Sequence, residues 1–124
     1  IYDLDMFADN GILKNAVLRR RVVSDDPNAG HLVEINNPKF LNIGKKIVKY
    51  FKLDWLYDCD IMMNKNNIPK ILEINPRPSG STAISLAAGI HLLDNVLEKY
   101  NKEKISIYKV KSNKIIMPNK INFK

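Results

Sequence analysis

Two short strands joined by an asparagine-rich turn constrain the fold more than any other feature of this chain. Residues 55–63 and 69–75 have the composition of strands, and the segment 64–67 (Asn-Lys-Asn-Asn) between them has the composition of a turn. Together they predict an antiparallel hairpin. If the turn is centred on its last two asparagines, Asp60 of the first strand lies directly opposite Glu73 of the second.

The second strand of this hairpin ends in a group of polar residues. Because side chains alternate along a strand, Glu73 and Asn75 point to one side, away from their apolar neighbours. Arg77 joins that side if the chain stays extended past Pro76. A carboxylate, an amide oxygen and a guanidinium that converge in this way suit Mg²⁺ together with a phosphate group.

The pairing of Asp60 with Glu73 brings two negative charges together. Cross-strand neighbours lie about 4.5–5.5 Å apart at Cβ, and like charges at that distance are unfavourable unless a cation lies between them. A divalent metal ion is one solution. Two alternatives stay open: one of the carboxylates is solvated, or the register of the hairpin differs.

The rest of the chain predicts further strands and three helices. An Asp-Asn-Gly turn at 9–11 is a strong hairpin signal, and it joins an alternating strand over 1–8 to a second strand over 12–23. Asn37 and Pro38 mark the start of a helix, with the asparagine as its cap. The other expected elements are a polar loop over 24–30, a short extended segment over 31–35, helices over 38–52, 82–88 and 91–100, and one more strand followed by a loose end within 103–124. We therefore predict an α+β fold in which helices flank an antiparallel β-sheet.

Length and composition limit the possible functions. A chain of 124 residues forms one small domain, and it contains no apolar run of the roughly 20 residues that span a bilayer. The formal net charge is +7, but the lysines are scattered and do not interleave with aromatic residues, so we expect neither a nucleic-acid nor a membrane partner. The single cysteine, Cys59, is expected to face the core, and it fits a reducing compartment such as the cytoplasm.

The run Arg19-Arg20-Arg21 is the one tight cluster of positive charge. On a strand, Arg19 and Arg21 point one way and Arg20 the other. One of these sides could meet a nucleotide or an acidic substrate. The alternative is an exposed strand edge.

The hairpin and the opening strand resemble a known superfamily. The hairpin motif from Asp60 to Arg77 is similar to the metal-binding hairpin of ATP-grasp enzymes, and its run Glu-Ile-Asn-Pro-Arg-Pro-Ser most resembles the carbamoyl-phosphate synthase large subunit and related ligases. The opening segment 2–11 resembles the strand that follows the adenine-binding hinge in that superfamily. The resemblance covers residues 1–101, as a C-terminal ATP-grasp subdomain truncated at its N-terminus, and leaves 102–124 as a lysine-rich C-terminal extension.

The resemblance implies a role for individual residues. Asp60 and Glu73 would hold one Mg²⁺ or Mn²⁺ ion, and Glu73 and Asn75 would hold a second, next to the phosphates of ATP. Arg77 would contact the nucleotide and act as the catalytic residue that steadies the transferred phosphoryl group. Asp5 would approach the ribose, and the alternative is that it is a solvated carboxylate on the strand.

The implied function is that of an ATP-dependent ligase. In such an enzyme ATP phosphorylates a small carboxylate or bicarbonate, and an amine or ammonia displaces the phosphate from the acyl-phosphate intermediate. The N-terminal half of an ATP-grasp enzyme is not recognisable in this sequence, so we expect the chain to need that half as a partner and to be inactive alone. The alternative is a non-catalytic module that binds a nucleotide or a partner.

An ATP-grasp site lies between two subdomains, so we also expect an apolar margin that a partner would cover. The candidates are Ile1, Met6, Phe7, Ile61 and Met63. Exposed apolar patches and free strand edges favour association, so a homo-oligomer is expected.

Overall fold

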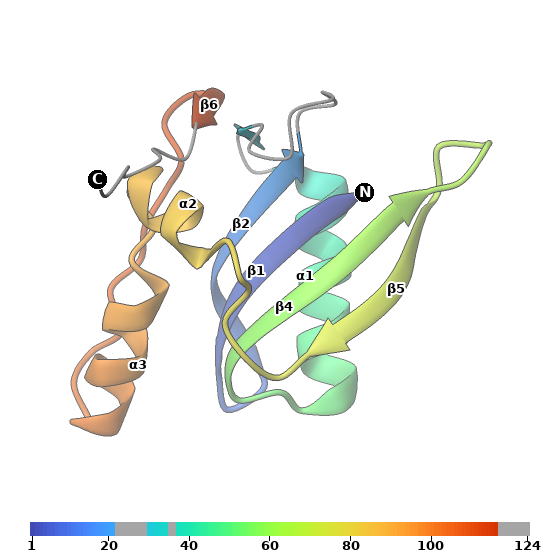
Figure 1. Cartoon of the computed structure of the whole chain (residues 1–124). Helices are drawn as coiled ribbons and strands as arrows, with labels where there is room; N and C mark the ends of the chain where they lie inside the picture. The colour runs from blue at the N-terminus through green and yellow to red at the C-terminus, as the bar shows by residue number, and fades with distance from the viewer. Residues whose placement is uncertain (22–29, 35–36, 117–124) are drawn as a thin grey trace.

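The computed structural model describes residues 1–21, 30–34 and 37–116. These residues form an antiparallel six-stranded sheet with helices on both of its faces (Figure 1), which confirms the predicted α+β class. The strands lie in the order β5-β4-β1-β2-β3-β6. The elements are β1 (Tyr2–Asp9), β2 (Ile12–Arg21), β3 (His31–Glu34), α1 (Pro38–Phe51), β4 (Trp55–Met63), β5 (Pro69–Asn75), α2 (Thr82–Ala87), α3 (Leu92–Tyr100) and β6 (Lys114–Ile116).

Local sequence signals explain where several elements begin and end. Asn10 and Gly11 have φ angles of 48° and 79°, as a two-residue hairpin turn of the primed type requires, and they join β1 to β2. The Asn37 side chain accepts a hydrogen bond from the backbone N–H of Lys39 and so caps α1. Lys52 then ends α1 in the left-handed conformation, with φ at 52°. The predicted cap and both predicted hairpins are confirmed.

The first face of the sheet packs against α1. Leu4 and Met6 of β1 are buried in this core together with Ile47 and Val48 of α1. Gly44 lets the helix approach the strand, because a Cβ atom at this position would lie 3.2 Å from the Met6 sulfur. Cys59 is buried in the same core, as predicted.

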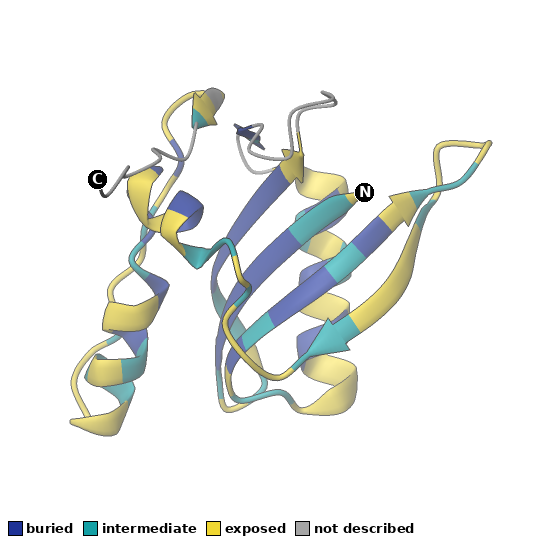
Figure 2. Ribbon diagram, in the orientation of Figure 1, coloured by how far each residue is buried: buried dark blue, intermediate teal, exposed yellow. Residues whose placement is uncertain are grey.

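The second face is divided into an apolar half and a polar half. In the apolar half, Phe7 and Val17 are buried against α2 and α3, which lie on the opposite side of the sheet from α1 (Figure 1). The polar half lies on the same central strands as the apolar half, and Figure 2 shows that these strands are largely buried. It nevertheless carries buried charged residues. These residues are Asp5 of β1, Arg19 of β2 and Asp58 of β4.

The segment after α3 also packs onto the second face. Val110 is buried in the apolar half, and β6 pairs with β3. The strand predicted within 103–124 is therefore present as β6. Part of the segment 102–124, which we predicted to be a C-terminal extension, belongs to the sheet. Lys99 ties α3 to the strand ends, because its Nζ lies 2.6 Å from an Asp9 oxygen and 3.0 Å from an Asp54 oxygen.

The expected apolar margin is wrong for three of its five residues. Met6 and Ile61 are completely buried beneath α1, and Phe7 is completely buried beneath α2 and α3. The physical reason is that helices cover both faces of the strands that carry these residues. Ile1 is exposed as expected, and Met63 is partly buried.

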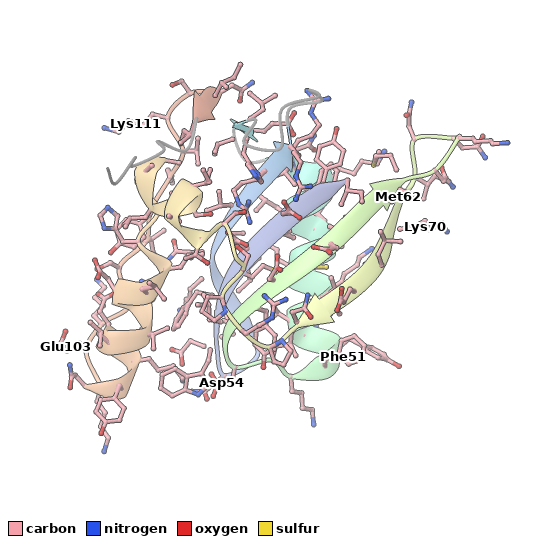
Figure 3. The ribbon with its side chains drawn as sticks, in the orientation of Figure 1. Phe51, Asp54, Met62, Lys70, Glu103 and Lys111 are labelled. Carbon is pink, nitrogen blue, oxygen red and sulfur yellow. The ribbon has the colours of Figure 1, made fainter. Side chains whose placement is uncertain are left out.

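Apolar exposure is instead found on the edge hairpin. Ile71 and Leu72 of β5 are 44% and 53% exposed, and Met62 of β4 is 44% exposed. Figure 3 shows the side chain of Met62 near that of Lys70, its register partner on β5. No helix within the described ranges is long and apolar enough to cross a membrane.

Most predicted element bounds agree with the structure within two residues. The strands predicted over 55–63 and 69–75 have these bounds in β4 and β5. The end of the strand predicted over 12–23 and almost all of the polar loop predicted over 24–30 lie outside the described residues, as do Ile35 and the predicted loose end from 117 onward.

Candidate functional site

The β4–β5 hairpin has the register that the sequence predicts. Asp60 lies opposite Glu73, and Asp58 lies opposite Asn75. The register shifts just after Asp60, where a bulge makes Ile71 the next partner on β5. All four polar side chains therefore belong to the second face of the sheet, at the point where the hairpin enters the loop after β5.

β1 pairs with the other edge of β4 and adds further carboxylates to this face. Asp3 lies opposite Asp60, and Asp5 lies opposite Asp58. Asp3, Asp58 and Asp60 each offer one oxygen, and these three oxygens all lie within 4.8 Å of one another. We call these three residues the acidic cluster.

The acidic cluster is electrostatically unfavourable without a cation. Burial, and after it the neighbouring carboxylates of Asp5, Asp60 and Asp3, raise the pKa of Asp58 to about 6 against the opposing effect of Arg19. Burial also raises the pKa of Asp3, while Arg19 lowers it and Asp60 raises it. Among the buried side-chain nitrogen and oxygen atoms of the described residues, Asp58 Oδ1 is the one that lacks a hydrogen-bond partner.

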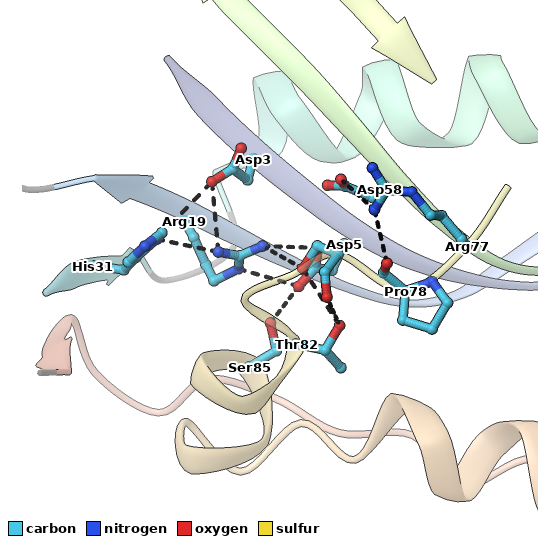
Figure 4. A network of polar contacts seen from close by, with 10 residues as sticks. Asp3, Asp5, Arg19, His31, Asp58, Arg77, Pro78, Thr82 and Ser85 are labelled. Carbon is cyan, nitrogen blue, oxygen red and sulfur yellow. Dashed lines mark hydrogen bonds and ion pairs between the residues drawn. The ribbon is translucent and has the colours of Figure 1, made fainter. Parts of the chain in front are cut away.

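A second group of charges beside the acidic cluster is fully paired (Figure 4). Arg19 is 0% exposed, and its guanidinium binds both Asp5 oxygens, with Nε to Oδ2 at 3.1 Å and Nη2 to Oδ1 at 2.9 Å. Its Nη2 also donates to Ser79 Oγ at 2.9 Å, and its Nη1 lies 3.1 Å from His31 Nδ1. The Ser85 hydroxyl donates to Asp5 Oδ2 at 2.5 Å. We call these five residues the Arg19 network.

Burial and the nearby arginines both act on the pKa of His31. Burial lowers the pKa of His31, and the charges of Arg19 and Arg21 lower it further. A neutral imidazole can accept a hydrogen bond from the guanidinium. The network therefore holds one buried cation, Arg19, with Asp5 as its closest counter-ion.

The structure brings Arg77 to the same face as the hairpin carboxylates. Its Nη1 lies 4.0 Å from Asp58 Oδ2 and donates to the Pro78 carbonyl at 3.0 Å (Figure 4). The side chain is 58% exposed, so it stands at the open edge of the site. The loop behind it is tied down through Ser79, which accepts the hydrogen bond from Arg19.

The other predicted site residues have different surroundings. Glu73 is exposed and Asn75 is half-buried, and both share the face of Asp60 through the register. Asp5 is 2% exposed, and both of its oxygens already accept hydrogen bonds from Arg19 or Ser85. The roles of these residues toward metal, phosphate and ribose stay predictions.

Several residues of this region escape sequence reasoning. Asp3 joins Asp60 because β1 pairs with β4, and the chain shows no local signal for a pairing of strands so far apart. Asp58 stands two residues before Asp60, so the alternation of β4 could have indicated that it shares the same face. Arg19 and Ser79 are also distant in sequence, and no pattern predicts that they meet.

The donor set at this face suits a hard divalent cation. Three carboxylates lie within one ligand sphere, an amide oxygen and a fourth carboxylate stand opposite on β5, and a buried carboxylate oxygen lacks a partner. Mg²⁺, Mn²⁺ and Ca²⁺ prefer such oxygen ligands. The residues that could hold a cation are therefore Asp3, Asp58, Asp60, Glu73 and Asn75.

Comparison with known proteins gives a family-level result. The model of the family described as "ATP-grasp in the biosynthetic pathway with Ter operon" matches residues 2–121. No curated protein matches the chain.

Proposed function

We propose that the open end of the β4–β5 hairpin binds the phosphates of ATP with a divalent cation. The premise is that this chain belongs to the ATP-grasp family described above and is an ATP-binding domain of the ligase type. The observation that carries this proposal is the convergence of Asp60, Glu73, Asn75 and Arg77 on one face of the sheet. These residue types supply oxygen ligands for a cation and a guanidinium for a phosphoryl group.

The position of Arg77 supports a role at the transferred phosphoryl group. Its guanidinium is exposed and stands beside Asp58, so a bound phosphate could reach it without displacing buried structure. The Arg19–Ser79 hydrogen bond holds the loop on which Arg77 stands. A fixed cation that faces developing negative charge stabilises the transition state of phosphoryl transfer.

The carboxylates and Asn75 would orient the nucleotide. When bound, a divalent cation neutralises phosphate charge and makes the terminal phosphorus easier to attack. Glu73 is the residue best placed to link cation and nucleotide, because it is exposed and lies opposite Asp60. Asn75, opposite Asp58, offers a neutral oxygen on the same face.

The finer reaction that we propose is ligation of a carboxylate with an amine. The γ-phosphoryl group of ATP passes to an oxygen of a small carboxylate or of bicarbonate, which releases ADP and forms an acyl phosphate. The nitrogen lone pair of an amine or ammonia then attacks the acyl carbon, and phosphate leaves. The similarity of the Glu73–Ser79 run to the carbamoyl-phosphate synthase large subunit favours this reaction, with the remainder of the site supplied by a partner segment.

Binding of a non-hydrolysable ATP analogue with Mg²⁺ tests the proposal by isothermal titration calorimetry. We expect the chain to bind the analogue and Glu73→Gln to weaken binding by about tenfold or more, because a charged ligand is removed. Asp94→Asn, which removes an exposed carboxylate on α3, is the matched control and should bind like the unchanged chain. Equal binding by the Glu73→Gln variant, or no binding by the unchanged chain, would overturn the proposal.

A further inference from the structure

We propose that Asp3, Asp58 and Asp60 form a divalent-cation site that bridges β1 and β4 and does not need a nucleotide. The resemblance to ATP-grasp enzymes pairs Asp60 with Glu73 and Asn75 and says nothing of the other two carboxylates. The acidic cluster joins Asp60 to the opposite neighbour strand instead. This inference stands whether or not the chain takes part in ligation.

The spacing of the three oxygens fits one shared ion. They lie within 4.8 Å of one another. Two oxygens that bind one Ca²⁺ at about 2.3–2.6 Å can lie up to about 5 Å apart, and two that bind Mg²⁺ at about 2.1 Å can lie up to about 4.2 Å apart. The spacing is therefore close to that of a site for a larger ion, and a smaller ion requires the three carboxylates to draw closer together.

Asp58 supplies a second observation that points to a ligand. Its side chain is 9% exposed, so more than nine-tenths of it is buried, and its Oδ1 atom has no hydrogen-bond partner. In Figure 4 the Asp58 carboxylate points toward the side on which Asp3 lies, while Arg77 approaches from the other side. A buried carboxylate oxygen without a donor is costly, and a cation would satisfy it.

The charges that face the cluster leave it short of positive charge. Arg19 forms a two-point pair with Asp5 and reaches Asp3 only through Nη1 at 3.5 Å. His31 Nδ1 lies 3.9 Å from Asp3 Oδ2 but faces the Arg19 guanidinium as well.

The far side of the cluster adds little compensation. Arg77, which is mostly exposed, stands 4.0 Å from Asp58, while Glu73 adds a negative charge opposite Asp60. Among the described residues, Arg77 is the one cation within 4.0 Å of Asp58, and Asp60 has no ion pair within that distance. A divalent ion removes the mutual repulsion directly, because one charge centre then contacts all three oxygens.

A Mn²⁺ titration followed by electron paramagnetic resonance tests the site, since bound Mn²⁺ loses the signal of the free ion. The measurement uses the chain without nucleotide at about pH 8, above the pKa of about 6 to which Asp58 is raised. We expect one site, competition by Mg²⁺ and Ca²⁺, and a weakening of about tenfold or more in Asp3→Asn. Asp94→Asn is the matched control, because it removes a carboxylate outside the cluster, and it should leave the affinity unchanged.

Glu73→Gln separates this inference from the proposed function. If nucleotide-free Mn²⁺ binding falls in Asp3→Asn but stays within about twofold in Glu73→Gln, the cluster holds the ion. If it falls in Glu73→Gln alone, the inference is overturned while nucleotide binding at the hairpin can stand. Absence of binding up to about 10 mM Mn²⁺, weaker than the weakest natural calcium sites, would also overturn the inference.

Melting curves keep the test independent of folding defects. Asp3→Asn removes a repulsive charge, so we expect it to fold at least as stably as the unchanged chain without metal. Mn²⁺ should then raise the melting temperature of the unchanged chain and leave that of Asp3→Asn unaltered. An equal rise in both proteins would show that the ion binds elsewhere.

Discussion

Asp5 and Asp58 are register partners on neighbouring strands and are almost equally buried, yet their surroundings differ. Asp5 receives two hydrogen bonds from Arg19 and one from Ser85. Asp58 has a buried oxygen with no donor, and its other oxygen lies 4.0 Å from an exposed arginine. A buried charge stabilises a fold only when it is paired, so Asp5 has the features of a structural residue and Asp58 those of a binding residue.

The arginines next to these two carboxylates differ in the same way. The guanidinium of Arg19 is completely buried and is fixed by four neighbours from different parts of the chain, namely Asp3, Asp5, His31 and Ser79. The guanidinium of Arg77 stands in solvent at the edge of the sheet. Two arginines above one sheet face thus differ: Arg19 is buried and bonds the Ser79 loop, whereas Arg77 is exposed, as the phosphate-binding role that we propose for it requires.

Of the changes that test this comparison, the replacement of Arg19 should lower the free energy of unfolding the most. Arg19→Met leaves Asp5 buried without its counter-ion, and loss of one partner of a buried ion pair costs about 3–5 kcal/mol. Urea unfolding should show this loss in the free energy of unfolding. Arg21→Met on the same strand is the control, because Arg21 is exposed and a change there should stay within about 0.5 kcal/mol.

A double variant identifies the cause of that loss. If the unpaired Asp5 charge is responsible, Arg19→Met combined with Asp5→Asn should recover part of the stability. A double variant no more stable than Arg19→Met would show that packing around the guanidinium matters instead.

Ser85→Ala should weaken the same paired side by a smaller amount. The Ser85 hydroxyl is buried and donates to Asp5 at 2.5 Å, and hydrogen bonds to charged groups contribute about 1.5–3 kcal/mol. Arg19 still holds Asp5 in this variant, so the protein should fold. The free energy of unfolding measures the loss, and a change equal to that of Ser81→Ala, whose hydroxyl does not cap α2, would contradict a special role for Ser85.

Replacement of Asp58 should change the free energy of unfolding in the opposite direction. In a metal-free buffer at about pH 8, Asp58→Asn should stabilise the fold by about 1–2 kcal/mol, because it removes a buried charge whose cost solvent only partly screens. The folded state holds the Asp58 proton up to about pH 6, whereas the ordinary pKa is 3.8. The folded state therefore binds more protons between these values, and the Asp58 contribution to stability falls as pH rises through that window.

Urea unfolding of both proteins across this pH window checks the sign. His31, whose pKa is lowered, contributes a change of the opposite sign, so the difference between the unchanged chain and Asp58→Asn isolates Asp58. That difference should be near zero at about pH 3.5 and grow in favour of the variant as pH rises. A difference that does not vary with pH would contradict the raised pKa.

The sequence predicts one half of this contrast much better than the other. The hairpin that carries Asp60 and Glu73 is local, because a short turn sets its register, and both its strands and its pairing were predictable. The pairing of β1 with β4 joins residues that are distant in sequence, such as Asp3 and Asp60, and α1, which follows β3 and precedes β4 in the chain, packs on one face of both strands. The acidic cluster depends on that pairing, so only Asp60 was predicted as one of its ligands.

The position of Arg19, the partner of Asp5, was also only partly predictable from the sequence. Three consecutive arginines on a strand predict that Arg20 points away from the other two, which the burial of Arg19 and the exposure of Arg20 support. The register of the β1–β2 hairpin makes Arg19 a diagonal neighbour of Asp5, but the sequence does not reveal that Ser79 and Ser85 cover the pair and add hydrogen bonds to it. Burial of a charge is a tertiary property, and a residue pattern along one strand does not contain it.

The smallest expected effect connects the two sides and concerns Ser79. Its hydroxyl accepts from Arg19 Nη2, which also donates to Asp5, so Ser79→Ala removes one bond from a guanidinium that keeps its main partner. The free energy of unfolding should fall by only about 0.5–1.5 kcal/mol, and Ser81→Ala is again the matched control. Arg77 lies two residues away, so the loop should loosen more than the fold does, and amide hydrogen exchange at 77–82 should become faster while exchange in β1 and β2 stays unchanged. Slower or unaltered exchange in that loop would mean that the backbone bond from Thr82 N–H to the Ser79 carbonyl suffices to hold Arg77 over Asp58.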